Sequence, residues 1–161
     1  MNFSQFGTAF VLGIGLVAAA HAEGLCKSGE AAIFNCKLQK SISSLCRSSD
    51  ARVLTYRNGI EGRLNLEISD GGGERRRVFH FSNIPYSGGG EAHIRFSRSG
   101  YTYFIYDKTV KSDDGTISSA GVVVYKSDKK ISDLVCGNDA SIREVAYHVI
   151  TKEAYRAIGA R

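Results

Sequence analysis

The chain has 161 residues and a formal net charge of +5. This length predicts one domain rather than two. The modest positive charge favours encounters with anionic surfaces such as lipid headgroups, lipopolysaccharide or acidic proteins. We expect no nucleic-acid partner, because the N-terminal residues predict that the protein is exported.

Residues 1–22 have the features of a secretory signal peptide. They contain no Asp, Glu, Lys or Arg, and their apolar run ends in Ala20-His21-Ala22, an A-x-A processing site. A membrane anchor is the alternative, but this run is short and interrupted by glycine, whereas a span needs about 20 residues. We therefore predict cleavage after Ala22, a periplasmic or secreted mature protein, and no stable membrane anchor.

The four cysteines, Cys26, Cys36, Cys46 and Cys136, all follow the predicted cleavage site. An even number of cysteines in an exported chain predicts two disulfides. Their spacing contains no C-x-x-C and no paired histidines, so we expect neither a zinc site nor a redox motif. Three pairings are open, and a Cys36–Cys46 bridge across a hairpin competes with bridges to Cys26 and Cys136.

The first predicted hairpin covers residues 30–47, where Phe34, Cys36 and Leu38 alternate with other residues as in a strand. A three-residue loop at 40–42 would set Cys36 opposite Cys46. This register is what makes a bridge between those two cysteines geometrically possible.

Residues 52–57 and 63–68 are the next predicted pair of strands. A two-residue turn at Asn58-Gly59 would set apolar residues against charged ones. We therefore prefer a five-residue loop at 58–62, which sets Leu54 opposite Leu66 and Tyr56 opposite Leu64.

Residues 76–81 are the fifth predicted strand. Glycine triplets at 71–73 and 88–90 bracket it, and Pro85 follows. Such boundaries are typical of an edge strand, and an arginine run at 75–77 would discourage association between sheets.

The segment 91–107 contains the strongest hairpin signal, because two alternating runs flank Ser99-Gly100. The predicted cross-strand pairs are Arg98 with Tyr101, Phe96 with Tyr103, and Ile94 with Ile105. One face of this hairpin is predicted core. The other face is either a second core layer or a binding surface, and it carries His93, Arg95, Ser97, Thr102, Phe104 and Tyr106.

A further turn at Gly115 and strands at 120–126 and 131–136 bring the total to about eight or nine short strands. Short strands with glycine-rich turns are typical of a β-sandwich or a flattened barrel. We therefore predict an all-β fold, an antiparallel β-sandwich or flattened barrel with one C-terminal α-helix, as a single domain over residues 23–161.

From Ser141 the apolar spacing changes to that of a helix. Glu144 follows Ser141 at capping-box distance, and Gly159 is a stop signal. The stripe consists of Ile142, Val145, Ala146, Val149, Ile150, Ala154, Ala157 and Ile158. It predicts a helix over residues 141–158 that packs on the sheets, with a partner-binding helix as the alternative.

The sequence shows no recognisable catalytic constellation. His80, His93 and His148 do not fall at metal-ligand spacing, and the nucleophile elbow G-x-S-x-G is absent. Asp113 and Asp114 are better explained by a turn than by a calcium loop. We therefore expect a non-catalytic protein without a metal or other cofactor.

The segment Ser99-Gly100-Tyr101-Thr102-Tyr103 resembles the S-G-x-x-Y loop of bacterial periplasmic lysozyme inhibitors. These are β-sheet proteins that insert such a loop into the active-site cleft of lysozyme. The resemblance implies inhibitory roles for Ser99, Gly100 and Tyr103, although the predicted register turns Tyr103 towards the core.

Three other short patterns resemble small exported bacterial proteins that carry no assigned function. They are C-x-S-G-E from Cys26, F-x-C from Phe34 and Y-R-x-G from Tyr56. This resemblance implies a compartment and no mechanism.

Two functional classes follow. The first is a binding protein, an inhibitor or immunity-type protein that acts on an envelope-active enzyme. Its predicted binding site consists of the turn residues Arg98, Ser99, Gly100 and Tyr101 and the neighbouring residues Tyr103, Arg95, Phe104 and Tyr106. The second is a basic protein that binds anionic lipid or polysaccharide at the envelope surface through Arg75, Arg76, Arg77, Arg95 and Arg98.

Overall fold

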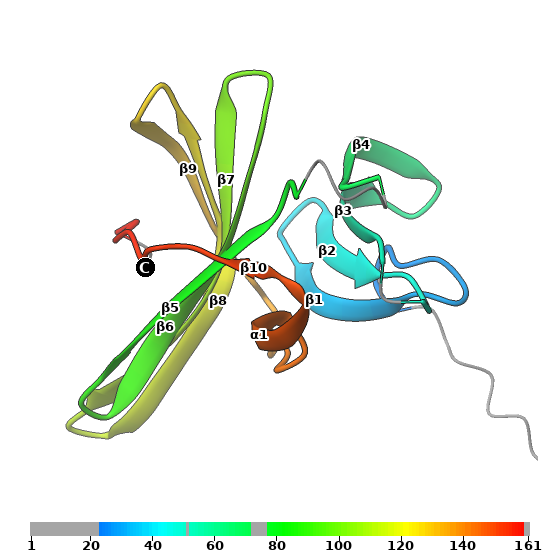
Figure 1. The fold of residues 1–161 in the computed structure, drawn as a ribbon. Coiled ribbons are helices and arrows are strands. Elements are labelled where there is room, and N and C mark those ends of the chain that lie inside the picture. The colour runs from blue at the N-terminus through cyan, green and yellow to red at the C-terminus, as the bar shows by residue number, and fades with distance from the viewer. Residues whose placement is uncertain (1–22, 51, 72–76, 160–161) are drawn as a thin grey trace, which may run out of the picture.

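The computed structural model describes residues 23–50, 52–71 and 77–159, and within them ten strands form two sheets (Figure 1). The first sheet has the order β1-β2-β3-β4: β1 (Ala31–Lys37), β2 (Ile42–Arg47), β3 (Leu54–Ile60) and β4 (Arg63–Ser69). The second has the order β10-β5-β6-β7-β8-β9: β5 (His80–Tyr86), β6 (Gly89–Arg98), β7 (Tyr101–Ser112), β8 (Gly115–Lys126), β9 (Lys129–Val135) and β10 (Thr151–Lys152). The predicted signal peptide lies outside the described residues, as do Arg75 and Arg76.

The four-stranded sheet packs on one face of the six-stranded sheet, and the main core lies between them. Buried residues of the first sheet include Phe34, Leu45 and Tyr56, and those of the second include Ile94 and Phe96. Burying each such side chain contributes about 1.5–3 kcal/mol by transfer from water. The all-β, sandwich-like prediction is therefore confirmed. We call the face of the six-stranded sheet that carries this core its inner face.

The six-stranded sheet is longer than its partner. Figure 1 shows the ends of the β5–β6 and β7–β8 hairpins reaching beyond the four-stranded sheet. We call this projecting part, residues 83–91 and 107–118, the arm.

The β6–β7 hairpin has the predicted register, with Ile94 opposite Ile105 and Phe96 opposite Tyr103. Ser99 has φ 52° and Gly100 has φ 78°, so both central residues of the turn are left-handed. A two-residue turn of this kind matches the right-handed twist of the flanking strands. The dipeptide and the alternation therefore specify the same pairing.

The β3–β4 register was predicted wrongly. The turn has Glu61 and Gly62 at its centre, and Tyr56 lies opposite Ile68 rather than Leu64. A bulge opposite Gly59, with Asn65 as the extra residue of β4, accommodates the shift, and a Cβ at Gly59 would lie 2.4 Å from the Arg63 carbonyl oxygen. Strict alternation does not reveal such a bulge, because it adds one residue to one strand only.

Two other strand predictions were wrong in detail. Cys36 lies opposite Ser43, because the β1–β2 loop occupies residues 38–41 instead of 40–42. β5 begins at His80 and runs through Pro85, whereas the predicted strand ended at residue 81. Only its first two residues pair with β10, so the rest of β5 is an edge where proline, which lacks an N–H group, is tolerated.

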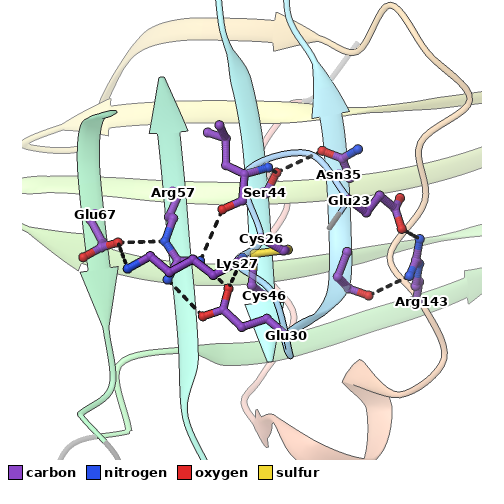
Figure 2. Close-up of a disulfide and its surroundings, with 12 residues drawn as sticks. Glu23, Cys26, Lys27, Glu30, Asn35, Ser44, Cys46, Arg57, Glu67 and Arg143 are labelled. Atoms are coloured by element: carbon purple, nitrogen blue, oxygen red, sulfur yellow. Dashed lines mark hydrogen bonds and ion pairs between the residues drawn. A yellow bond between two sulfur atoms is a disulfide. The ribbon is translucent and has the colours of Figure 1, made fainter. Parts of the chain in front are cut away.

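Both predicted disulfides are present, and their pairing is Cys26–Cys46 and Cys36–Cys136. The first ties the N-terminal segment to β2, as Figure 2 shows. The second joins β1 to the residue that follows β9, and it therefore links the two sheets.

The C-terminal helix exists, but its predicted extent of 141–158 is wrong. α1 covers only Ala146–Val149, has no side-chain cap, and is followed by β10, which pairs in parallel with β5. The apolar residues of this segment serve two surfaces. Ile142, Ala146 and Ile150 pack in the main core, whereas Ile158 packs on the opposite, outer face of the six-stranded sheet. One straight helix cannot reach both faces.

Candidate functional site

The predicted turn stands at one end of the six-stranded sheet, beside the β8–β9 turn. Arg98, Ser99 and Gly100 are exposed, and a Cβ built at Gly100 meets nothing within 4 Å. Tyr101 lies opposite Lys126 of β8. We call Arg98, Ser99, Gly100, Tyr101, Tyr103 and Lys126 the hairpin end.

Two cations flank the half-buried Tyr101. The Lys126 ammonium lies 5.2 Å from the centroid of the Tyr101 ring, within the range of a cation–π contact. Arg98, the cross-strand neighbour of Tyr101, donates a hydrogen bond to the Glu67 carbonyl of β4. The hairpin end is therefore basic and aromatic, and one of its cations is attached to the other sheet.

Tyr103 packs between the exposed turn and the core. Its ring is stacked on Phe96 with 5.1 Å between the centroids, and Phe96 in turn contacts Tyr56 at 4.5 Å. Burial and the nearby Tyr101 raise the pKa of the Tyr103 phenol, and Arg98 acts in the opposite direction. Tyr103 thus connects the hairpin end to the core, as the predicted register requires.

Phe104 and Tyr106, which the sequence predicts to be part of the binding surface, are buried at 2% and 0% exposure. They form a second core cluster with Val123 and Ile158 on the outer face. That placement was wrong, and the alternative of a second core layer is confirmed. The reason is the C-terminal segment, which crosses to this face and brings Ile158 onto it.

Arg95 lies on the same outer face, and its charge is already paired within the protein. Its guanidinium donates to both carboxylate oxygens of Glu153, with the Nε at 2.8 and 3.0 Å. The structure therefore separates Arg95, Phe104 and Tyr106 from the hairpin end and leaves the residues around the turn together.

The outer face also contains a buried cluster around His93, whose contacts with Glu91 and Tyr155 were not predicted from the sequence. His93 is fully buried, its Nε2 lies 2.6 Å from Glu91 Oε1, and its ring stacks on Tyr155 at 5.0 Å. Burial lowers the pKa of His93, although Glu91 and Glu153 oppose the shift. Burial and Glu91 raise the pKa of Tyr155 to about 12.

This cluster holds the C-terminal segment against the sheet. A neutral His93 donates its Nε2–H to Glu91, which leaves Nδ1 as a buried acceptor without a donor among the described residues. The alternation of His93 and Arg95 in the sequence placed both residues on this face, and Glu91 continues the same alternation. Tyr155 lies within the segment predicted as a helix and was not part of its apolar stripe, so its contact with His93 was not predicted.

A second polar network lies on the four-stranded sheet (Figure 2). The Arg57 side chain is 4% exposed and donates to Glu30 at 2.6 and 3.0 Å and to Glu67 at 2.7 Å. Burial acts to raise the pKa of Glu30, but hydrogen bonds from Arg57 and the Lys27 N–H lower it overall. With every charge paired, this network fastens the N-terminal segment to the sheet.

Within the described residues, one group places potential metal ligands together: Cys26, Glu30 and Cys46. Both cysteines are consumed by their disulfide, and a metal needs the thiolate. The Glu30 carboxylate is bound to Arg57. This group therefore does not suit a metal ion.

None of the helices in the described part of the chain has the length and apolar character needed to cross a membrane. Comparisons with protein-family models, with curated proteins and with solved structures found no match. The hairpin end, with its exposed turn and its cation–aromatic contact, is the candidate functional site.

Proposed function

We propose that this protein is a non-catalytic, periplasmic or secreted binding protein that blocks an envelope-active enzyme by inserting the hairpin end into its cleft. The observation that carries the proposal is the exposed Ser99-Gly100 turn, which stands on a hairpin whose inner residues are buried. Export is consistent with the two disulfides, because such bonds persist in oxidising compartments.

The hairpin end is suited to binding because it is already ordered. Both turn residues adopt the backbone that a two-residue hairpin turn needs, and Tyr103 is stacked on Phe96. A rigid loop loses little conformational entropy when it binds, so more of the contact energy appears as affinity. Loops on rigid scaffolds carry binding residues in many folds for this reason.

The charges indicate the kind of cleft. Arg98 and Lys126 lie on either side of Tyr101, so the hairpin end complements a cleft with acidic groups. Most glycoside hydrolases place a pair of carboxylates around the bond that they cleave. An enzyme of that class acting on envelope polysaccharide is therefore the partner that we propose.

The resemblance to periplasmic lysozyme inhibitors supports part of this assignment. Ser99 and Gly100 are exposed at the tip, where an inserted loop would need them. Tyr103 departs from the pattern, since its ring faces Phe96. We therefore assign the direct aromatic contact to Tyr101 and a supporting role to Tyr103.

The alternative function, binding of anionic lipid or polysaccharide, has weaker support. Of its three described arginines, Arg95 is paired with the Glu153 carboxylate on the outer face and Arg77 donates to Thr151, whereas Arg98 donates to the uncharged Glu67 carbonyl at the hairpin end. They do not form one continuous basic surface.

The test is capture of partners from an envelope extract at low and high salt. Charge contacts at a surface weaken as the Debye length falls from about 8 Å at 0.15 M to about 3 Å at 1 M ionic strength, whereas an inserted loop is affected less. We expect a protein partner that is retained at high salt and lost with Ser99→Ala and Tyr101→Ala.

Ser127→Ala is the matched control, because Ser127 has φ 45° in the neighbouring β8–β9 turn, close to the 52° of Ser99. A partner retained equally by all variants would remove the hairpin end from the proposal. Lysozyme itself can be tested by turbidity, and undiminished lysis by every lysozyme type at micromolar protein would discard the resemblance.

A further inference from the structure

A groove of about 300 Å³ lies on the inner face of the arm, where the six-stranded sheet extends past its partner. Its lining includes Asn83 of β5, Gly90 of β6, Asp107 and Thr109 of β7, and Tyr147 of α1. The distance along β7 from Asp107 to Tyr101 is about 20 Å. The groove is therefore separate from the hairpin end.

Glycine keeps this groove open. Gly90 pairs with Pro85 of β5 on one side and with Thr109 of β7 on the other, and all three residues line the groove. A Cβ on Gly90 would lie 3.2 Å from the Ile84 carbonyl oxygen and would occupy space on the groove side of the strand. The glycine triplet at 88–90 thus shapes a concave surface as well as a turn.

Asp107 gives the groove its charge. Its Oδ2 accepts a hydrogen bond from the Ile142 N–H at 2.9 Å, and among the described residues no basic side chain forms an ion pair with it. Burial, together with Asp139, raises the pKa of this carboxyl group. A half-buried carboxylate without a cation favours a ligand that supplies one.

Tyr147 provides an aromatic wall beside this carboxylate. Its ring packs on Phe81 with 4.4 Å between the centroids, so its orientation is held by the core. Asp107 and Tyr147 line the same groove, and burial together with the neighbouring Asp107 raises the pKa of the Tyr147 phenol. Carboxylates and aromatic faces both attract ammonium groups.

We infer that the groove binds an amino-sugar unit with a free, protonated amine. The ammonium group would pair with Asp107 beside the ring of Tyr147, and sugar hydroxyls would bond to Asn83 and Thr109 on the two walls. Glu91 also lines the groove, but its Oε1 lies 2.6 Å from His93 Nε2. The mixture of one carboxylate without an ion pair among the described residues, one aromatic ring, an amide and a hydroxyl matches the few convergent polar groups that small-ligand sites provide. A simple apolar ligand would leave the carboxylate unpaired.

Nuclear magnetic resonance titration of the purified protein tests this inference, with a glucosamine trisaccharide as the probe and its N-acetylated form as the uncharged control. We expect amide shifts at Gly89 and Gly90 with the free-amine sugar alone. Asp107→Asn should weaken binding by about tenfold or more, the effect of losing a hydrogen bond to a charged group. Asparagine keeps an oxygen to accept the Ile142 N–H.

Asp113→Asn, the same charge change in an exposed turn, should leave the affinity unchanged. Asn83→Ala, on the opposite wall, should weaken binding and provides a second variant in case Asp107→Asn fails to fold. Tyr101→Ala should bind normally, which separates this groove from the hairpin end. Equal binding of both sugars, full affinity in Asp107→Asn or in a folded Asn83→Ala, or no shifts up to about 10 mM sugar would overturn the inference.

Discussion

At the residue scale, the same alternation puts Phe96 and His93 on opposite faces of β6, and each anchors a different part of the chain. Phe96 is stacked under Tyr103 and so supports the hairpin end. His93 is stacked under Tyr155 and so supports the C-terminal segment. A single strand therefore positions two distant elements, because successive side chains point to opposite faces.

The buried His93 makes stability depend on pH. Burial lowers its pKa in the folded state from 6.5, so the unfolded chain binds its proton more readily. The stabilisation conferred by neutral His93 is complete above pH 6.5 and is lost as the pH falls from there through the folded-state pKa. Its charged neighbours, Glu91 and Glu153, oppose this loss without reversing it.

The measurement is the melting temperature of the wild type and of His93→Gln between pH 8 and pH 5, since glutamine does not titrate. We expect the wild type to lose more stability than the variant across this range. If the melting temperatures of the two proteins fell in parallel with pH, His93 would not change its protonation on unfolding.

At the element scale, two neighbouring turns share one geometry but differ in sequence. The β6–β7 turn has Gly100 at φ 78°, whereas the β8–β9 turn has Asp128 at φ 62°. A left-handed backbone is unfavourable for residues with a Cβ, although Asp tolerates it better than most. The β8–β9 turn is therefore the weaker of the two.

Asp128→Gly should stabilise the protein by about 0.5 kcal/mol, because it relieves the left-handed conformation. The contact that is lost, from Arg156 to Asp128 at 3.4 Å, is exposed and contributes little. Urea unfolding measures the change, and Gly100→Asp is the reverse experiment, expected to destabilise by a similar amount. A neutral or destabilising Asp128→Gly would contradict this account.

At the scale of the whole molecule, the two disulfides have different consequences. Cys26–Cys46 closes a separation of 20 residues within one sheet, whereas Cys36–Cys136 closes 100 residues and joins the sheets. In the chain-entropy description, the longer loop restricts the unfolded chain more. The link between the sheets is therefore the greater contributor to stability.

Replacing Cys36 and Cys136 by serine should cost about 4.7 kcal/mol, against about 3.3 kcal/mol for the same change at Cys26 and Cys46. Denaturant unfolding of both double variants, with the wild type as reference, measures the difference. The order of the two effects is the decisive result, and a larger loss for the Cys26–Cys46 pair would refute the chain-entropy explanation.

The sequence by itself determined the features that depend on neighbouring residues. Alternation and the Ser99-Gly100 dipeptide specify the β6–β7 register, because the turn backbone and the two-residue period leave one pairing that buries Ile94 and Phe96. The all-β class and the presence of two disulfides follow from the same kind of local evidence.

Tertiary structure alone decided the features that join distant parts of the chain. Which cysteines pair depends on β1 meeting the end of β9, and the groove depends on α1 bringing Tyr147 beside Asp107. The C-terminal stripe has helical spacing, yet its apolar residues are divided between two faces of one sheet. Packing overrides local propensity there, because burying Ile158 over Phe104 and Val123 requires the chain to leave the helix and cross the sheet.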